Sequence, residues 1–183
     1  MYRTALLLAE GFEEVEALTP VDVLRRAGVE CVTVSLRAEK LVPSSRSIPV
    51  LADRSWDEAD FEEMDGLILP GGLAGTARLS EDPRVEAMLQ RFASAGKLTA
   101  AICAAPTVLA KAGLLEGRKA VCYPGLEDRM QGAVMCYEPV MRDGTVITGR
   151  GMGASLPFAL ALVEYFCGTE AADALAEKIV YKR

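Results

Sequence analysis

Cys103 stands at the point in the sequence best suited to a nucleophile. It follows Leu98–Ile102, an apolar run that predicts a buried strand, and it precedes Ala104–Ala112, which predicts a helix with Pro106 in its first turn. A cysteine at such a strand-to-helix corner occupies the position of the nucleophile elbow of hydrolases, although the flanking glycines of G-x-S-x-G are absent. The amides and partial positive charge of a helix N-terminus would lower the thiol pKa. The alternative is a small cysteine buried in the core.

The absence of histidine limits how this thiol could be activated. With no histidine among 183 residues, Ser-His-Asp triads, Cys-His pairs and zinc sites built on imidazole are excluded. Acid–base steps must then use Cys, Asp, Glu, Lys or Tyr. The five cysteines are widely spaced and form no C-x-x-C pair, which favours a reducing compartment over a disulfide framework or a zinc ribbon. Apart from Cys103, we expect Cys31, Cys122 and Cys167 in the core and Cys136 in a loop.

Two glycines after another predicted strand could bring backbone amides to the same site. Gly66–Leu69 is apolar and ends at Pro70-Gly71-Gly72. Paired glycines let backbone amides approach a ligand closely or form an anion-binding nest. Together with the Ala104 amide, they could hold a developing oxyanion. The alternative is a simple tight turn, which glycine forms equally well.

A glutamate is the candidate acid. Glu10, Glu13, Glu14 and Glu16 surround the start of a helix predicted over Glu13–Ala27. Acids at a helix start usually offset the helix dipole and face solvent, and we expect this of the first three. Glu16 lies one turn further in and could point back toward the sheet edge, where burial would raise its pKa and keep it protonated. A protonated carboxyl could hydrogen-bond to the thiolate and shuttle a proton. Spacing alone leaves a surface position equally open.

Strands and helices alternate along the whole chain, with no repeat and no linker. This alternation predicts one domain over residues 1–183, a doubly wound α/β sandwich with a mostly parallel sheet. In such sheets, ligands bind at the carboxyl ends of the strands, where the strand order reverses. Strands are expected at Thr4–Ala9, Cys31–Leu36, Gly66–Leu69, Leu98–Ile102 and Lys119–Tyr123, and hairpins over Ile48–Ala52 and Asp143-Gly144. Helices are expected at 13–27, 82–96, 104–112, 154–166 and 170–180.

Composition limits the partners and the location. The chain is 51% hydrophobic and 25% charged, which fits an ordinary globular core. A net charge of −6 argues against a broad basic face, so we do not expect a nucleic acid partner. No apolar run approaches the ~18 residues of a membrane span, and the start has no signal-peptide pattern. We therefore expect a cytoplasmic protein without a membrane partner.

Five segments together resemble the ThiJ/PfpI family and, within it, the parkinsonism-associated deglycase (DJ-one) branch. They follow nearly end to end in the family's order, and the most specific are the A-A-I-C-A-A-P corner and the E-E-x-E turn. The segments are A-E-G-F-E-E-V-E-A-L-T-P-V-D-V-L-R-R-A-G at 9–28, L-I-L-P-G-G at 67–72, A-A-I-C-A-A-P-T-V-L-A at 100–110, C-Y-P-G at 122–125 and T-G-R-G-M-G-A-S-L-P-F-A-L-A-L-V-E at 148–164.

The resemblance implies a flavodoxin-like sandwich of the class I glutamine amidotransferase type, assembled as a homodimer and needing no cofactor or metal. It implies a reactive cysteine at Cys103 beside a protonated Glu16. The family's oxyanion amides would fall on Gly72 and Ala104. The arginine that lies near the cysteine in this branch would match Arg46.

Two further residues match the helix that the family uses at its dimer contact, Asp22 and Arg26. The chain also departs from the family in two places. Tyr123 stands where many relatives have a histidine, so a Cys-His peptidase mechanism is not supported. The T-S-R-G-P-G motif appears as T-G-R-G-M-G at 148–153. The same segment suggests a dinucleotide fingerprint, but the G-x-G-x-G spacing and the missing acidic strand end do not favour nucleotide binding.

Family members are described as cofactor-independent glyoxalases, as deglycases of glycated amines, thiols or nucleotides, and as oxidative-stress sensors. We therefore expect Cys103 to attack the aldehyde carbon of a 2-oxoaldehyde while Glu16 moves the proton. The same thiol could instead be oxidised to a sulfinate, so a non-enzymatic redox sensor or protective chaperone is the alternative.

Overall fold

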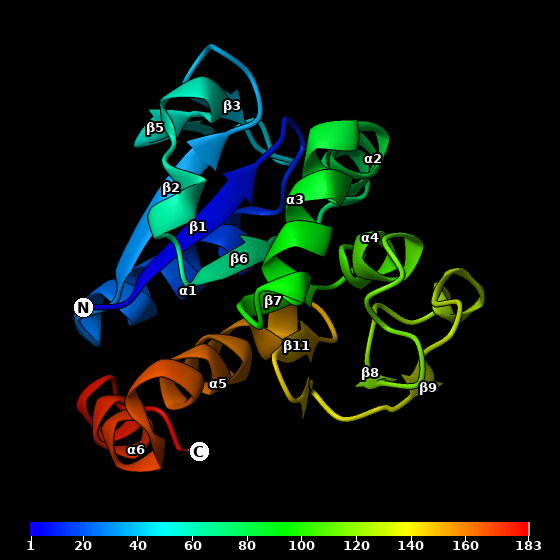
Figure 1. Ribbon diagram of the computed structural model, residues 1–183. Helices are drawn as coiled ribbons and strands as arrows, with labels where there is room; N and C mark the ends of the chain where they lie inside the picture. Colours follow the sequence, from blue (N-terminus) through cyan, green and yellow to red (C-terminus); the bar gives the residue numbers. More distant parts are fainter. Residues whose placement is uncertain (183) are drawn as a thin grey trace.

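A computed structural model describes residues 1–182, so Arg183, which the single-domain prediction includes, lies outside the described residues. Its central sheet has seven strands in the order β10-β11-β7-β6-β1-β2-β5 (Figure 1). All neighbouring pairs are parallel except β10 and β11, which form an antiparallel hairpin. The strands are β1 (Arg3–Leu8), β2 (Glu30–Ser35), β5 (Arg54–Ser55), β6 (Gly66–Leu69), β7 (Leu98–Ile102), β10 (Val140–Asp143) and β11 (Val146–Gly149).

Helices cover both faces of this sheet. One face packs against α1 (Glu14–Arg26) and α5 (Ser155–Cys167), and α6 (Thr169–Lys178) packs against α5 (Figure 1). The other face packs against α3 (Pro83–Ser94) and α4 (Pro106–Lys111), and α2 (Leu73–Glu81) packs against both of these helices. The doubly wound, mostly parallel α/β sandwich expected from the sequence is confirmed.

Side-chain alternation in the strands divides the core into two layers. In β1, Ala5 and Leu7 pack with α3 and α4, whereas Leu6 and Leu8 pack with α1 and α5. Successive strand residues point to opposite faces, so a strand covered on both sides must be apolar throughout. This explains why the interior strands read as continuous apolar runs.

Smaller elements lie outside the main sheet. The hairpin expected over residues 48–52 is present, because β3 (Leu41–Pro43) pairs antiparallel with β4 (Pro49–Leu51). A second pair joins β8 (Lys119–Ala120) to β9 (Val134–Met135). Single 3₁₀ turns span η1 (Trp56–Glu58), η2 (Phe61–Glu63), η3 (Glu127–Arg129) and η4 (Met152–Ala154).

Four local features differ from what the sequence predicted. The strand expected at Lys119–Tyr123 is only two residues long and lies outside the main sheet, because β11 occupies the place beside β7. The helix expected at 104–112 begins only at Pro106, and α2 was not expected at all. Cys167, expected in the core, is exposed at the end of α5.

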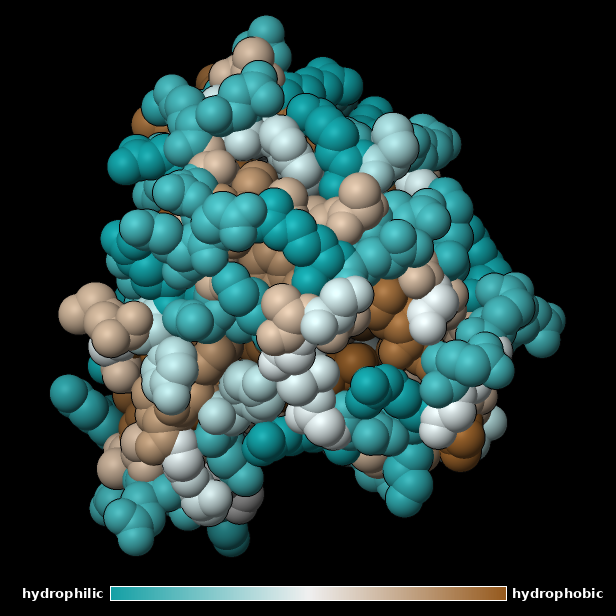
Figure 2. Space-filling view, in the orientation of Figure 1, coloured by the Kyte–Doolittle hydropathy of each residue, from teal (hydrophilic) through white to brown (hydrophobic). Residues whose placement is uncertain are grey.

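The strand order reverses at β1, which lies between β2 and β6. The segments after β1, β6 and β7 therefore meet at one edge of the sheet, where ligands of such folds bind. Most of the surface shown in Figure 2 is hydrophilic, with apolar residues in small areas. None of the helices within residues 1–182 has the length and apolar character needed to cross a membrane.

Candidate active site around Cys103

Cys103 has a strained backbone at the end of β7. Its φ angle is +66°, in the left-handed region that residues other than glycine rarely adopt. Two hydrogen bonds hold it there: the Cys103 N–H donates to the Gly149 carbonyl at 2.9 Å, and the Tyr123 N–H donates to the Cys103 carbonyl at 2.8 Å. Strain of this kind persists only where the surroundings impose it, and it is typical of functional corners.

Glu16 lies against this corner. Its side chain, on the first turns of α1, is only 1% exposed, and its Oε2 accepts a hydrogen bond of 3.0 Å from the Gly71 N–H. The same carboxyl hydrogen-bonds to the Cys103 sulfur. Burial, with a smaller contribution from the charge of Glu13, raises the pKa of Glu16 to about 7, although both hydrogen bonds act to lower it. Of the two positions that the spacing of Glu16 left open, the structure thus has the buried one, with the raised pKa.

The thiol pKa differs from the sequence-based expectation. Burial raises the pKa of Cys103 to about 12, and the negative charge of Glu16 and the hydrogen bond with it act in the same direction. The N–H groups of Ala104 and Gly72 donate to the sulfur and lower the pKa, but they do not outweigh burial. The low thiol pKa predicted from the sequence is therefore wrong. α4 spans only Pro106–Lys111, too short for a strong dipole at its end.

Glycine is required at the two positions that follow Pro70, just after β6. A Cβ on Gly71 would meet the Glu16 carboxylate and lie 2.7 Å from the Cβ of Cys103. Gly72 has a φ of +88°, and a Cβ there would lie 2.8 Å from the Glu13 nitrogen. These close approaches allow the Pro70-Gly71-Gly72 turn to touch both the acid and the thiol.

A cavity of about 570 Å³ opens above Cys103. Its lining includes Gly72 and Ala104 from the cysteine's immediate surroundings, and Arg46 and Tyr123 from two loops. Both loop side chains are exposed, and Tyr123 stands where a family histidine was expected. The structure thus brings seven of the nine sequence-selected residues to this site: Cys103, Glu16, Gly71, Gly72, Ala104, Arg46 and Tyr123.

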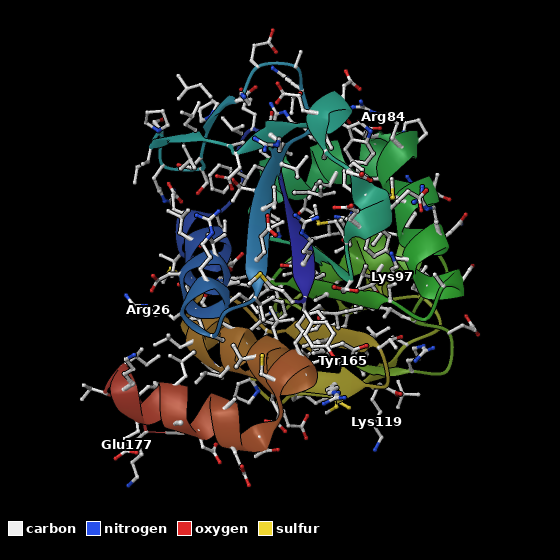
Figure 3. All side chains as sticks on the ribbon, turned by 60° about the vertical axis from the view of Figure 1, so that its left-hand side comes forward. Arg26, Arg84, Lys97, Lys119, Tyr165 and Glu177 are labelled. Carbon is white, nitrogen blue, oxygen red and sulfur yellow. The ribbon has the colours of Figure 1, made fainter. Side chains whose placement is uncertain are left out.

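Asp22 and Arg26 lie elsewhere. They form an ion pair one turn apart on α1, with 2.7 Å between Arg26 Nε and Asp22 Oδ2, and Figure 3 shows Arg26 on the outer side of the helix. Both line a separate open hollow of about 790 Å³ between α1 and the start of α5. Exposed apolar side chains, among them Leu18 and Leu156, share this hollow.

Sequence reasoning missed two residues near the site. Glu14, expected to face solvent, is only 7% exposed, and its carboxylate accepts hydrogen bonds from residues 44–46. Arg78 of α2 lines the cavity and donates to the Glu10 carbonyl at 3.0 Å. The neighbouring serines at 44 and 45 could have indicated a partner for a buried Glu14, because clustered hydroxyls can donate hydrogen bonds to a carboxylate. No signal pointed to Arg78, since its helix was not predicted.

Comparison with known proteins agrees with this geometry. The model of the DJ-1/PfpI family matches residues 2–165. The Parkinson disease protein 7 homolog of Danio rerio is 39% identical, covering 98% of this chain and 97% of its own length. A protein from Pyrococcus abyssi named a deglycase is 33% identical, covering 82% of this chain and 91% of its own.

A solved structure, oxidized DJ-1 from Toxoplasma gondii, superimposes with a TM-score of 0.95 at 34% identity, covering 100% of both chains. The matching fold and the length of the alignment together identify the group to which this protein is related. The chain belongs to the DJ-1/PfpI family and has its α/β flavodoxin-like fold.

Proposed function

We propose that this chain is a single-domain, cofactor-independent enzyme of glyoxalase or deglycase type that uses Cys103 to act on 2-oxoaldehydes or their adducts. One observation carries the proposal: the Cys103 sulfur, the Glu16 carboxyl and the amides of Gly72 and Ala104 converge beside one cavity. Membership of the DJ-1/PfpI family and the similarity to a protein named a deglycase support enzyme activity of this class.

The first step forms a bond between the Cys103 sulfur and the aldehyde carbon. The carbonyl oxygen takes up the electron pair as the bond forms, and the amides of Gly72 and Ala104 are available to stabilise its negative charge. The chain has no histidine, so the thiol proton leaves through Glu16 or through solvent. Delivery of this proton to the oxygen gives a hemithioacetal and leaves Glu16 as a carboxylate.

Glu16 then moves a proton between adjacent carbons. Its carboxylate removes the proton from the former aldehyde carbon, and the carboxylic acid returns it to the neighbouring carbon. The hydroxyl proton of the hemithioacetal passes to the 2-oxo oxygen, so that the 2-oxo group becomes a hydroxyl group. The product of this shift is a thioester of Cys103. Water adds to the thioester and releases the 2-hydroxy acid with the free thiol, so the net change is addition of one water molecule.

The raised pKa of Glu16 suits this role. A carboxyl that titrates at about 7 can both accept and donate a proton near neutral pH. Transfer of one proton from Cys103 to Glu16 gives a thiolate beside a neutral acid, and it removes the charge repulsion that raises the thiol pKa. The reactive form of the pair therefore carries one proton.

Turnover of methylglyoxal tests the proposal. We expect Cys103→Ala to abolish formation of lactate and Glu16→Gln to reduce it by at least about 100-fold, the range typical of a general acid–base group. Cys167→Ser is the matched control, because this thiol is exposed and lies outside the lining of the Cys103 cavity. Unchanged lactate formation in either active-site variant would show that the replaced residue is not catalytic.

A second candidate function is redox sensing by the same thiol. The Gly72 and Ala104 amides and a protonated Glu16 could hold a sulfinate at Cys103, and one similar structure is of an oxidized protein. The thiolate would react with two molecules of hydrogen peroxide to give a sulfinate and two of water. Mass spectrometry after mild peroxide treatment, combined with the turnover assay, separates the candidates: a sensor gains two oxygens at Cys103 and shows negligible turnover.

We also infer a cytoplasmic homodimer. The free state of all five cysteines supports a reducing compartment. The exposed apolar side chains of α1 and α5, beside the Asp22–Arg26 ion pair, support self-association through this face. The partner in this proposal is a second copy of the chain.

A further inference from the structure

Glu14 is a buried carboxylate that the proposed reaction does not use. Its Oε1 accepts hydrogen bonds from Ser44 Oγ at 2.5 Å and from the Arg46 N–H at 2.7 Å, and its Oε2 accepts one from Ser45 Oγ at 3.0 Å. Burial acts to raise its pKa, but the hydrogen bonds outweigh burial and the pKa is lowered. Glu14 is therefore ionised at neutral pH. All of these donors come from one turn, which lies 30 to 32 residues further along the chain.

We name residues 44–47 the serine turn. Backbone bonds also tie it to the segment before α1, because the Ser45 N–H donates to the Phe12 carbonyl at 2.7 Å. Within the turn, Ser47 has a φ of +61°, a strained value for a residue other than glycine. A buried carboxylate that loses its donors carries a large desolvation cost, so Glu14 resists any movement of the turn away from α1.

The serine turn forms one wall of the Cys103 cavity and carries Arg46. The backbone N–H of Arg46 is itself one of the donors to Glu14. The position of the Arg46 Cα relative to α1 is therefore fixed by a direct hydrogen bond. Since α1 also carries Glu16, one helix sets the place of both the acid and the arginine.

Arg46 is the cation of this cavity without a carboxylate partner among the described residues. The other lining cation, Arg78, lies 3.8 Å from Glu10, which also pairs with Arg37 at 3.1 Å. The remaining lining acid, Glu13, accepts a backbone N–H in the first turn of α1, where the helix dipole offsets its charge. The charge of Arg46 is therefore available to a ligand.

We propose that Glu14 is a positioning residue, which holds the serine turn so that Arg46 faces the Cys103 cavity and favours substrates and thiol reagents that carry a negative charge. The preference for anionic 2-oxoaldehydes rests on the proposed function. The preference of Cys103 for anionic alkylating reagents does not, because it needs only an accessible thiol.

Two reagents of similar size and different charge test this proposal. Iodoacetate is anionic and iodoacetamide is neutral, so the ratio of their rates of alkylation at Cys103 reports the local electrostatic field. We expect Arg46→Gln to lower this ratio about threefold, the effect of one charge across ~6 Å of water. Glu14→Ala should lower it by the same factor. Glu14→Gln loses the same negative charge as Glu14→Ala but should not lower the ratio, because its amide oxygen still accepts from Ser44 and Arg46 and its NH₂ group can donate to the hydroxyl of Ser45.

The double variant Glu14→Ala/Arg46→Gln separates positioning from general loosening of the structure. If Glu14 acts through Arg46, the double variant has the ratio of Arg46→Gln alone. A further threefold fall in the double variant, or a normal ratio in Glu14→Ala, would overturn the proposal. Should Glu14→Ala fail to fold, Ser44→Ala/Ser45→Ala removes two donors and leaves α1 intact, and it should lower the ratio in the same direction.

Enzyme kinetics supply the second readout. We expect Glu14→Ala to raise KM about threefold for a 2-oxoaldehyde that ends in a propionate group, and to leave KM for methylglyoxal and both kcat values nearly unchanged. An equal change in KM for the two substrates would contradict a preference for anionic substrates. Absence of turnover with both substrates would contradict the proposed function alone, and the alkylation ratio would still decide the role of Glu14.

Discussion

The backbone N–H of Gly71 donates a hydrogen bond of 3.0 Å to Oε2 of Glu16. This bond joins the end of β6 to the start of α1, and it orients the carboxyl that also contacts the Cys103 sulfur. A Cβ on residue 71 would meet the carboxylate and would lie 2.7 Å from the Cβ of Cys103. The acid and the thiol can therefore lie together only because the residue beside them is glycine.

Replacement of this glycine should damage both stability and activity. We expect Gly71→Ala to lower the free energy of unfolding by about 1–3 kcal/mol, because the added methyl group overpacks the corner. We expect kcat/KM for methylglyoxal to fall at least about tenfold, because Glu16 must move. Gly153→Ala is the control, since a Cβ there meets no atom within 4 Å. Urea unfolding and turnover measure the two effects, and similar behaviour of both variants would show that the predicted crowding is wrong.

The reactivity of Cys103 should follow the titration of Glu16. The reactive form, a thiolate beside a protonated Glu16, contains one proton, and the one-proton state of the pair becomes dominant as pH rises through about 7. The rate of alkylation by iodoacetamide should therefore rise through about pH 7 and then reach a plateau. In Glu16→Gln this midpoint should be absent, and the rate should rise only at the pKa of the thiol itself. A midpoint near 7 that persists in the variant would assign it to another group.

The stability of the protein should fall as pH rises through the same range. The pKa of Glu16 is raised from 4.5 to about 7, so between these values the folded state holds a proton that the unfolded chain has released. The stabilisation is complete below pH 4.5 and is lost as pH rises through about 7. Between pH 5 and pH 8 this amounts to about 2–3 kcal/mol. Urea unfolding of Glu16→Gln at both pH values should show a smaller loss than the natural chain. An equal loss would mean that other groups cause it.

Association of two chains should depend on the apolar side chains of α1. Leu18 is 40% exposed and lines the hollow between α1 and α5. We expect the natural chain to have the mass of a dimer by light scattering, and Leu18→Arg to have the mass of a monomer, because a buried unpaired charge is costly at an interface. Val134→Arg, at an exposed apolar position on β9, should remain dimeric. A monomeric natural chain would remove the dimer proposal.

Periodicity predicted most of the main sheet because interior strands must be apolar on both faces. It failed where an element is short or polar. Residues 119–123 have the β-branched and apolar character of a strand, yet β11 takes the place beside β7. α2 begins directly after Gly72 and has a mixed sequence, so no local signal separated it from a loop.

The sequence by itself determined the fold, the cysteine corner and the lack of any imidazole, because these follow from residue types and short-range patterns. It also selected Glu16 among four neighbouring glutamates. Only the tertiary structure decided the burial of Glu14, whose hydrogen-bond donors lie 30 to 32 residues away in the sequence. It likewise decided the thiol pKa, because burial and the charge of Glu16 outweigh the nearby amides. Desolvation and charge contacts depend on distances between remote segments, and no pattern within one segment contains those distances.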